Sequence, residues 1–229
     1  MSTNISAELV KKLRDRTGAG MMECKAALQD ANGDLEEATT ILRKRGLAQA
    51  AKKSGRSTSE GLIGSYIHQG GKIGVLVELN CESDFVAKTD DFQTLLKELA
   101  LQVAAASPEY VRRDDVPADV LERERAIYRA QMQNSGKPPH VIDKIVEGKL
   151  GSFYEQAVLL DQPSIRDPKT TVSQMVQAAI AKLGENLGIA RFVRFRVGDQ
   201  PGSSARREPG GQPAGTPTSP GSGPSGNPA

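Results

Sequence analysis

The chain has 229 residues, which is enough for one large domain or two small ones with a buried core. Its 30 basic and 28 acidic residues leave a net charge of +2, so the basic surface of a dedicated duplex-binding protein is not expected. No run approaches the ~20 apolar residues that span a bilayer, and the N-terminus lacks the apolar region of a secretory signal. We therefore expect a cytoplasmic protein without membrane or direct nucleic-acid partners.

Three short helices divided by glycines are predicted over residues 4–46. The first has Ser6 as an N-cap and Gly18 as its stop, and the third is expected to end at Gly46. A bundle this small has little room for a catalytic cleft, so residues 1–47 are predicted to be a recognition module. At the start of the second helix, Met21 and Met22 are either core residues, the commoner case for methionine, or an adaptable contact surface.

A linker and a β-hairpin are predicted next. Residues 48–60 change from a basic, Ala-rich helical continuation into a Gly/Ser/Thr segment, which is typical of a linker. Two apolar, β-branched runs then flank Gly70–Gly71, a strong hairpin pattern. The second run, residues 73–79, is apolar at nearly every position and so predicts a strand covered on both faces.

Helical patterns and one late strand complete the predicted core, residues 61–198. Strict alternation in the late strand puts two sets of side chains on opposite faces. One set is Ile189, Val193, Phe195 and Val197, and the other is Phe192, Arg194 and Arg196. The expected fold is α+β, with a three-stranded antiparallel sheet and packed helices. Residues 199–229, rich in Gly, Pro and Ser, are predicted to be a disordered tail.

Signatures of catalysis are missing from the sequence. His68 and His140 have no companion at metal-ligand spacing, and Cys24 and Cys81 form no CxxC pair. No glycine-rich phosphate-binding loop and no nucleophile motif occurs. We therefore expect no enzyme activity, no metal and no cofactor, and we favour a protein that binds protein.

The connection after the hairpin reads "LNCESDFVAKTDDF" and places a large apolar Phe85 where a small polar residue is usual. Ser83 is a suitable N-cap for a helix that begins there, and Asp84 suits the positive end of that helix. This local pattern favours Phe85 as a core residue at a helix start. An exposed contact residue is the alternative.

These stretches also resemble a known family. "LVKKLRDRTGAGMMECKAALQDANGDLEEATTILRKRG" and "LNCESDFVAKTDDF" are similar to bacterial elongation factor Ts, the guanine-nucleotide exchange factors for elongation factor Tu. "KTTVSQMV" and "RFVRFRVG" agree with later parts of the family, so the resemblance runs from about Ile5 to Val197. It implies a UBA-like three-helix domain that docks on the partner's GTPase domain, followed by a sheet-and-helix core.

The family's T-D-F-V motif, which is inserted near the partner's magnesium site, stands here as Ser83, Asp84, Phe85 and Val86. Serine at the first position keeps the hydroxyl of the commoner threonine. The resemblance thus reverses the local interpretation of Phe85 and implies an outward-pointing wedge.

The resemblance implies further contacts and a second copy of the chain. The stretch "TGAGMMECK" would place Met21, Met22 and Lys25 against the GTPase domain. His68 aligns with a family contact residue, although a lone strand histidine is more often structural. The single hairpin resembles the short form of the family, in which a homodimer supplies two cores. Phe192, Arg194 and Arg196, on one face of the late strand, then lie at a candidate subunit or partner interface.

The predicted function is therefore guanine-nucleotide exchange: the protein binds elongation factor Tu with GDP, disturbs its Mg²⁺ site and promotes GDP release. One alternative is a UBA-like protein-binding adaptor without exchange activity. Another is an RNA-associated module that uses the basic linker.

Overall fold

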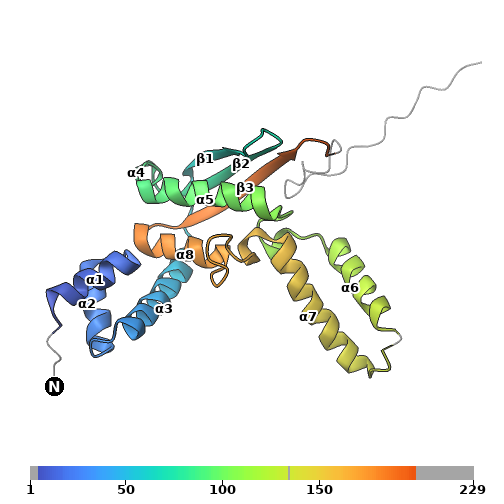
Figure 1. Ribbon diagram of the computed structural model, residues 1–229, viewed down its shortest axis with the longest axis horizontal. Helices are drawn as coiled ribbons and strands as arrows, with labels where there is room; N and C mark the ends of the chain where they lie inside the picture. Colours follow the sequence, from blue (N-terminus) through green and yellow to red (C-terminus); the bar gives the residue numbers. More distant parts are fainter. Residues whose placement is uncertain (1–4, 134, 200–229) are drawn as a thin grey trace, which may run out of the picture.

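The computed structural model describes residues 5–133 and 135–199 (Figure 1). Its longer helices are α1 (Ala7–Thr17), α2 (Met21–Asp30), α3 (Leu35–Lys53), α5 (Asp90–Ala106), α6 (Ala118–Met132), α7 (Pro139–Ala157) and α8 (Val172–Leu183). The strands are β1 (Glu60–Ile67), β2 (Ile73–Cys81) and β3 (Leu187–Arg196). Short helical turns are α4 (Asp84–Ala87), η1 (Arg113–Asp115) and η2 (Leu159–Asp161). The predicted α+β fold is confirmed, whereas the tail expected over 199–229 lies, from residue 200, outside the described residues.

Helices α1, α2 and α3 form a bundle with its own core around Leu13, Cys24 and Leu28, all fully buried. Ser6 caps α1, because its hydroxyl accepts a hydrogen bond from the N–H of Leu9 at 3.2 Å. The inward face of α2 is made by Cys24 and its neighbours, so the expectation that Met22 packs inward is wrong.

The sequence predicts a helix up to Gly46 and a helical continuation after it, and the structure joins the two into one unbroken helix, α3. Gly46 lies within the helix and faces α8. A Cβ added at this position would stand 3.1 Å from the Cβ of Ala181, so the glycine allows the two helices to pack closely. Further along, Ala50 is buried in the core cluster of the sheet domain. The helix therefore joins the bundle to the core directly, across the boundary expected near residue 48 (Figure 1).

The sheet has the order β1-β2-β3, with both neighbouring pairs antiparallel. Helix α5 lies across one face, and fully buried Phe92 and Leu99 pack there among Val77 and Leu79 of β2 (Figure 1). On the other face Leu76 is 44% exposed, so the expectation of a strand covered on both faces is wrong. Burial alternates along β2 because the helices pack on one side only.

A bulge in β3 changes which of its side chains face the helices. Leu79 pairs with Ile189 but Glu78 pairs with Arg191, which leaves Ala190 as an extra residue. Paired residues of an antiparallel ladder point to the same face. Phe192 pairs with buried Val77, and Arg194 with buried Val75. The two therefore lie on the covered face.

The expected division of β3 is thus wrong for Ile189, which shares the covered face with Phe192 instead of the open face with Val193. The guanidinium of Arg194 donates to the carbonyl oxygen of Ala104 in α5 at 3.3 Å. The open face carries Ile63, Ile67, Leu76, Val193 and Phe195.

Helices α6 and α7 pack against each other and project from the core at the end opposite the N-terminal bundle (Figure 1). Helix α6 has no buried residue among those described. Exposed ion pairs join the two helices, such as Arg125 with Glu147 and Arg129 with Asp143. Because such pairs contribute little stability each, the hairpin depends on its root in the core.

Candidate functional site

Phe85 is exposed on the surface of α4. The side chain is 79% exposed, so the local interpretation as a core residue is wrong and the exposure implied by the family resemblance is confirmed. Helix α4 has four residues, of which it buries Ala87 and partly Val86 against the core. The side of α4 that carries Val86 and Ala87 packs on the core, and Phe85 lies on the side that faces the solvent.

Ser83 occupies the N-cap position of α4, but its hydroxyl does not cap the helix. It donates instead to Oε1 of Glu185 at 2.6 Å, and the backbone N–H of Ser83 donates to Oε2 of Glu185 at 3.0 Å. The capping hydrogen bond expected from the sequence is therefore not made, because the hydroxyl points to the carboxylate of Glu185, from a distant part of the chain, and donates a hydrogen bond to it.

Charged groups flank the exposed ring. Nζ of Lys88 lies 2.6 Å from a carboxylate oxygen of Asp84 and 5.9 Å from the centre of the Phe85 ring. The hydrogen bond from Lys88, together with its positive charge, lowers the pKa of Asp84 below its usual value. Asp84 is therefore ionised at neutral pH, and the surface offers an aromatic ring beside a carboxylate.

Met21 and Met22 form a second exposed apolar surface at the start of α2. They are 49% and 75% exposed, which favours the contact-surface alternative over the core alternative. The backbone N–H of Gly20 donates to a carboxylate oxygen of Glu23 at 3.3 Å and so fixes this helix start. Lys25 is exposed on the same helix.

Lys182 of α8 connects the two surfaces. Its ammonium lies 2.7 Å from Oδ1 of Asp91 in α5, the helix that follows α4. Its aliphatic stem packs against Gly18 at the end of α1, where an added Cβ would stand 3.1 Å from the lysine Cε. Lys182 thus contacts both the bundle that carries Met22 and the part of the core that carries Phe85, beside the packing of α3 on α8.

His68 lies apart from these surfaces. It follows β1 at the end of the hairpin that is remote from α4, and its Nδ1 is 3.0 Å from the hydroxyl of Tyr66. This neighbour supplies the structural role that a lone strand histidine commonly has. The contact implied for His68 stays a prediction.

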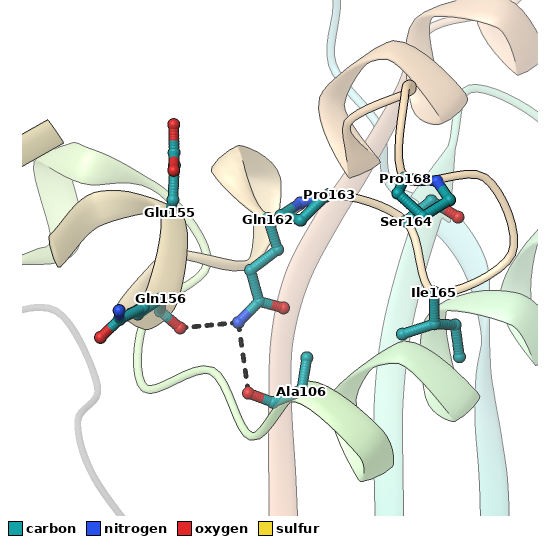
Figure 2. A pocket seen from close by; sticks show the side chains of 8 residues that line it. All are labelled: Ala106, Glu155, Gln156, Gln162, Pro163, Ser164, Ile165 and Pro168. Carbon is teal, nitrogen blue, oxygen red and sulfur yellow. Dashed lines mark hydrogen bonds between the residues drawn. The ribbon is translucent and has the colours of Figure 1, made fainter. Parts of the chain in front are cut away.

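A pocket of about 400 Å³ lies between the C-terminal ends of α5 and α7 and the segment that follows α7, with Ala106, Gln156 and Gln162 in its lining (Figure 2). The amide nitrogen of Gln162 donates to the carbonyl oxygens of Gln156 and Ala106, at 2.7 and 3.4 Å (Figure 2). The polar side chain therefore joins the chain segments around the pocket, which indicates a structural role.

None of the groupings of His, Cys, Asp and Glu in residues 5–133 and 135–199 has three members placed to hold a metal ion. In the same part of the chain, every helix is too short or too polar to cross a membrane.

Comparison with known proteins decides the family. The family model described as "Elongation factor TS" matches residues 5–199. The chain belongs to the elongation factor Ts family. It is 56% identical over 204 residues to "Elongation factor Ts" of Solibacter usitatus, covering 89% of this chain and 96% of the relative. Identity to the Elongation factor Ts of Fervidobacterium nodosum is 60% over 195 residues, covering 85% and 99%. The protein is therefore a translation elongation factor that acts in protein biosynthesis.

Sequence reasoning on this elongation factor Ts family member missed Glu185 and Lys182. Glu185 follows Gly184, whose positive φ ends α8, so the sequence around it reads only as a helix stop. Its partner Ser83 lies 102 residues away in the chain. Local pattern therefore had no means of pairing the two.

Proposed function

We propose that this protein is the guanine-nucleotide exchange factor for elongation factor Tu. It binds elongation factor Tu with GDP in the cytoplasm, disturbs the Mg²⁺ site and promotes GDP release. The exposure of Phe85, at 79%, carries this proposal. A large aromatic side chain held outward between charged residues offers a partner much contact area, and buried aromatic anchors dominate the energetics of interfaces.

In the proposed mechanism, Phe85 and Val86 enter the partner near its Mg²⁺ ion. Mg²⁺ requires near-octahedral geometry and helps to hold the phosphates of GDP, so a displaced ligand set weakens the nucleotide. The ionised Asp84 accepts hydrogen bonds from the displaced segment of the partner, and Ser83 anchors the motif. The protein itself needs no cofactor and breaks no covalent bond.

The bundle supplies grip in this mechanism. Met21 and Met22 are flexible, polarisable side chains that adapt to a partner surface, and Lys25 adds a positive charge beside them. The contact of Lys182 with Gly18 and Asp91 supports a fixed relation between the gripping surface and Phe85. Docking through the bundle then brings Phe85 to the same place in each encounter.

Exchange in this scheme is a handover. If the protein lowers the affinity of elongation factor Tu for GDP, GDP lowers the affinity for the protein by the same factor. Incoming nucleotide then releases the exchange factor.

We also propose a homodimer, formed through the open face of the sheet. Phe195 is 58% exposed and Ile67 67% exposed on this face, which no helix among the described residues covers. Proteins that act alone rarely expose a contiguous apolar patch, and two copies of one sheet can stack in an isologous interface. The sequence suggested Phe192 and Arg194 for the interface, but these two face the helices. We therefore propose Val193 and Phe195, on the open face, in their place.

Light scattering at micromolar concentration tests the dimer. We expect the mass of two chains for the wild type and of one chain for Phe195→Asp. Ile127→Asp, which changes an exposed apolar residue of α6, is the control and keeps the mass of two chains. A wild-type mass of one chain contradicts the homodimer.

Stopped-flow release of fluorescent GDP from elongation factor Tu, with and without the protein, tests the exchange function. We expect release to accelerate with protein concentration until it saturates. Unchanged release contradicts the proposal. The adaptor alternative predicts that residues 1–55 alone keep all of the protein-binding activity. The RNA alternative predicts RNA binding that weakens steeply as the salt concentration rises.

A further inference from the structure

The chain segment that leads into α4 is held by a carboxylate from the other end of the core. Glu185 lies in the turn between α8 and β3, and both of its oxygens accept hydrogen bonds from Ser83. One comes from the backbone N–H at 3.0 Å and the other from the hydroxyl at 2.6 Å. A two-point contact to a carboxylate fixes the orientation of Ser83 as well as its position.

The segment before α4 and the turn between α8 and β3 are also joined by a second contact, in which the segment before α4 supplies the carboxylate. Oε1 of Glu82 accepts the backbone N–H of Asn186 at 2.6 Å, and the side chain of Asn186 donates to the carbonyl oxygen of Arg56 at 2.9 Å. These contacts lie just beyond the terminal pair of the two strands, in which Cys81 at the end of β2 pairs with Leu187 at the start of β3. The hydrogen bonds therefore extend the pairing of the two strands into the connection that leads to α4.

At its far end, helix α4 is held by Val86, which packs partly against the core and whose carbonyl oxygen accepts a hydrogen bond from the Thr89 hydroxyl at 2.7 Å; at its start it depends on Ser83. A helix of four residues is not stable by itself, because nucleation orders several residues for few hydrogen bonds. Ala87 is the one residue of α4 that is buried, and Ser83 makes no side-chain cap. The direction in which Phe85 points thus depends on how Ser83 is anchored.

We propose that Glu185 is a positioning residue for nucleotide exchange: it fixes Ser83 so that α4 presents Phe85 to the partner in one orientation. The inference rests on the proposed function, in which Phe85 is the wedge. A wedge whose direction is set before binding loses less conformational entropy on insertion than a mobile one. Glu185 acts through Ser83 and touches neither the nucleotide nor the partner.

GDP release measured over a series of protein concentrations tests the proposal. Glu185→Gln keeps the size of the side chain but loses the negative charge and one of the two acceptor oxygens, so the charge-assisted contact with Ser83 is replaced by a weaker neutral one. We expect its maximal release rate to fall about tenfold and the half-saturating concentration to change by less than about twofold, since the bundle still docks. Ser83→Ala is expected to fall similarly, whereas Ser83→Thr keeps the wild-type rate. A wild-type maximal rate for Glu185→Gln overturns the proposal.

Asp161→Asn is the matched control. Asp161 also makes a long-range contact, with the Arg113 guanidinium at 2.6 and 3.0 Å, but it lies away from α4. Its loss is expected to leave the release curve unchanged. An equal fall in the control and in Glu185→Gln means general destabilisation and overturns the proposal.

The Phe85→Ala background separates positioning from a general structural effect. If Glu185 acts through Phe85, Glu185→Gln lowers the rate no further when Phe85→Ala is already present. The same tenfold loss in both backgrounds contradicts the role of Glu185. A slow Phe85→Ala variant beside a fast Glu185→Gln variant contradicts that role alone, whereas a wild-type rate for Phe85→Ala contradicts the wedge itself.

Discussion

Helices α4 and α5 begin with nearly the same sequence and have opposite fates. "SDF" opens α4 at Ser83, and "TDDF" opens α5 at Thr89. Phe85 is 79% exposed, whereas Phe92 is fully buried under the sheet. The hydroxyl of Thr89 caps α5 by accepting from the N–H of Phe92, but the hydroxyl of Ser83 donates to Glu185.

The comparison shows that a local pattern predicts where a helix begins but not which of its faces is covered. Helix α5 is long enough to pack a row of apolar residues on the sheet, so Phe92 joins that row. Helix α4 ends after one turn and buries only its small residue, Ala87. One phenylalanine therefore stabilises the fold, while the other is free to act on a partner.

Truncation of the buried ring is expected to have the largest effect. Phe92→Ala leaves a cavity under the sheet and lowers the free energy of unfolding by about 3–5 kcal/mol. Urea denaturation followed by circular dichroism measures it. A loss below about 1 kcal/mol would show that α5 is not the main cover of the sheet.

Phe85→Ala is expected to do the reverse. The maximal rate of GDP release falls about a hundredfold, which corresponds to about 2.7 kcal/mol in the activation free energy. The free energy of unfolding changes by less than about 0.5 kcal/mol, because the ring is exposed. Stopped-flow release and urea denaturation of the same sample measure both. Equal release by the variant and the wild type would refute the wedge.

The two hydroxyl residues sharpen the comparison further. Thr89→Ala removes a true cap and lowers the free energy of unfolding by about 1 kcal/mol, with GDP release unchanged. The matched change, Ser83→Ala, affects the release rate instead. If Thr89→Ala slows release and leaves stability intact, the two helix starts do not differ in the way proposed.

The smallest effect is expected for Lys88→Ala. The lysine pairs with Asp84 on the surface, where ion pairs contribute little, so the urea midpoint stays unchanged and the release rate changes by less than about threefold. Comparison of the two readouts with Phe85→Ala shows whether the ring or its charged neighbour carries the activity. A larger loss than for Phe85→Ala would assign the activity to the cation.

Much of the fold was predictable because its causes are local. Ser6 caps α1 and Gly70–Gly71 turns the hairpin, both as expected. The errors occurred where distant segments meet. Gly46 reads as a helix stop, yet it lies inside α3, where the lack of a side chain lets α8 pack closely.

The candidate site divides in the same way. Motif resemblance selected Phe85 and Met22, and the structure shows both exposed. It could not select Glu185, because a carboxylate in a helix-stop turn has no local feature that marks a partner 102 residues away.

The sequence by itself determined the family, the order of the elements and the S-D-F-V motif of residues 83–86, since each of these depends on short runs of neighbouring side chains. The tertiary structure alone decided that the bulge at Ala190 turns Phe192 toward the helices and that Glu185 holds Ser83. Each of these depends on contacts between segments far apart in the chain, and such contacts exist only once the core has packed.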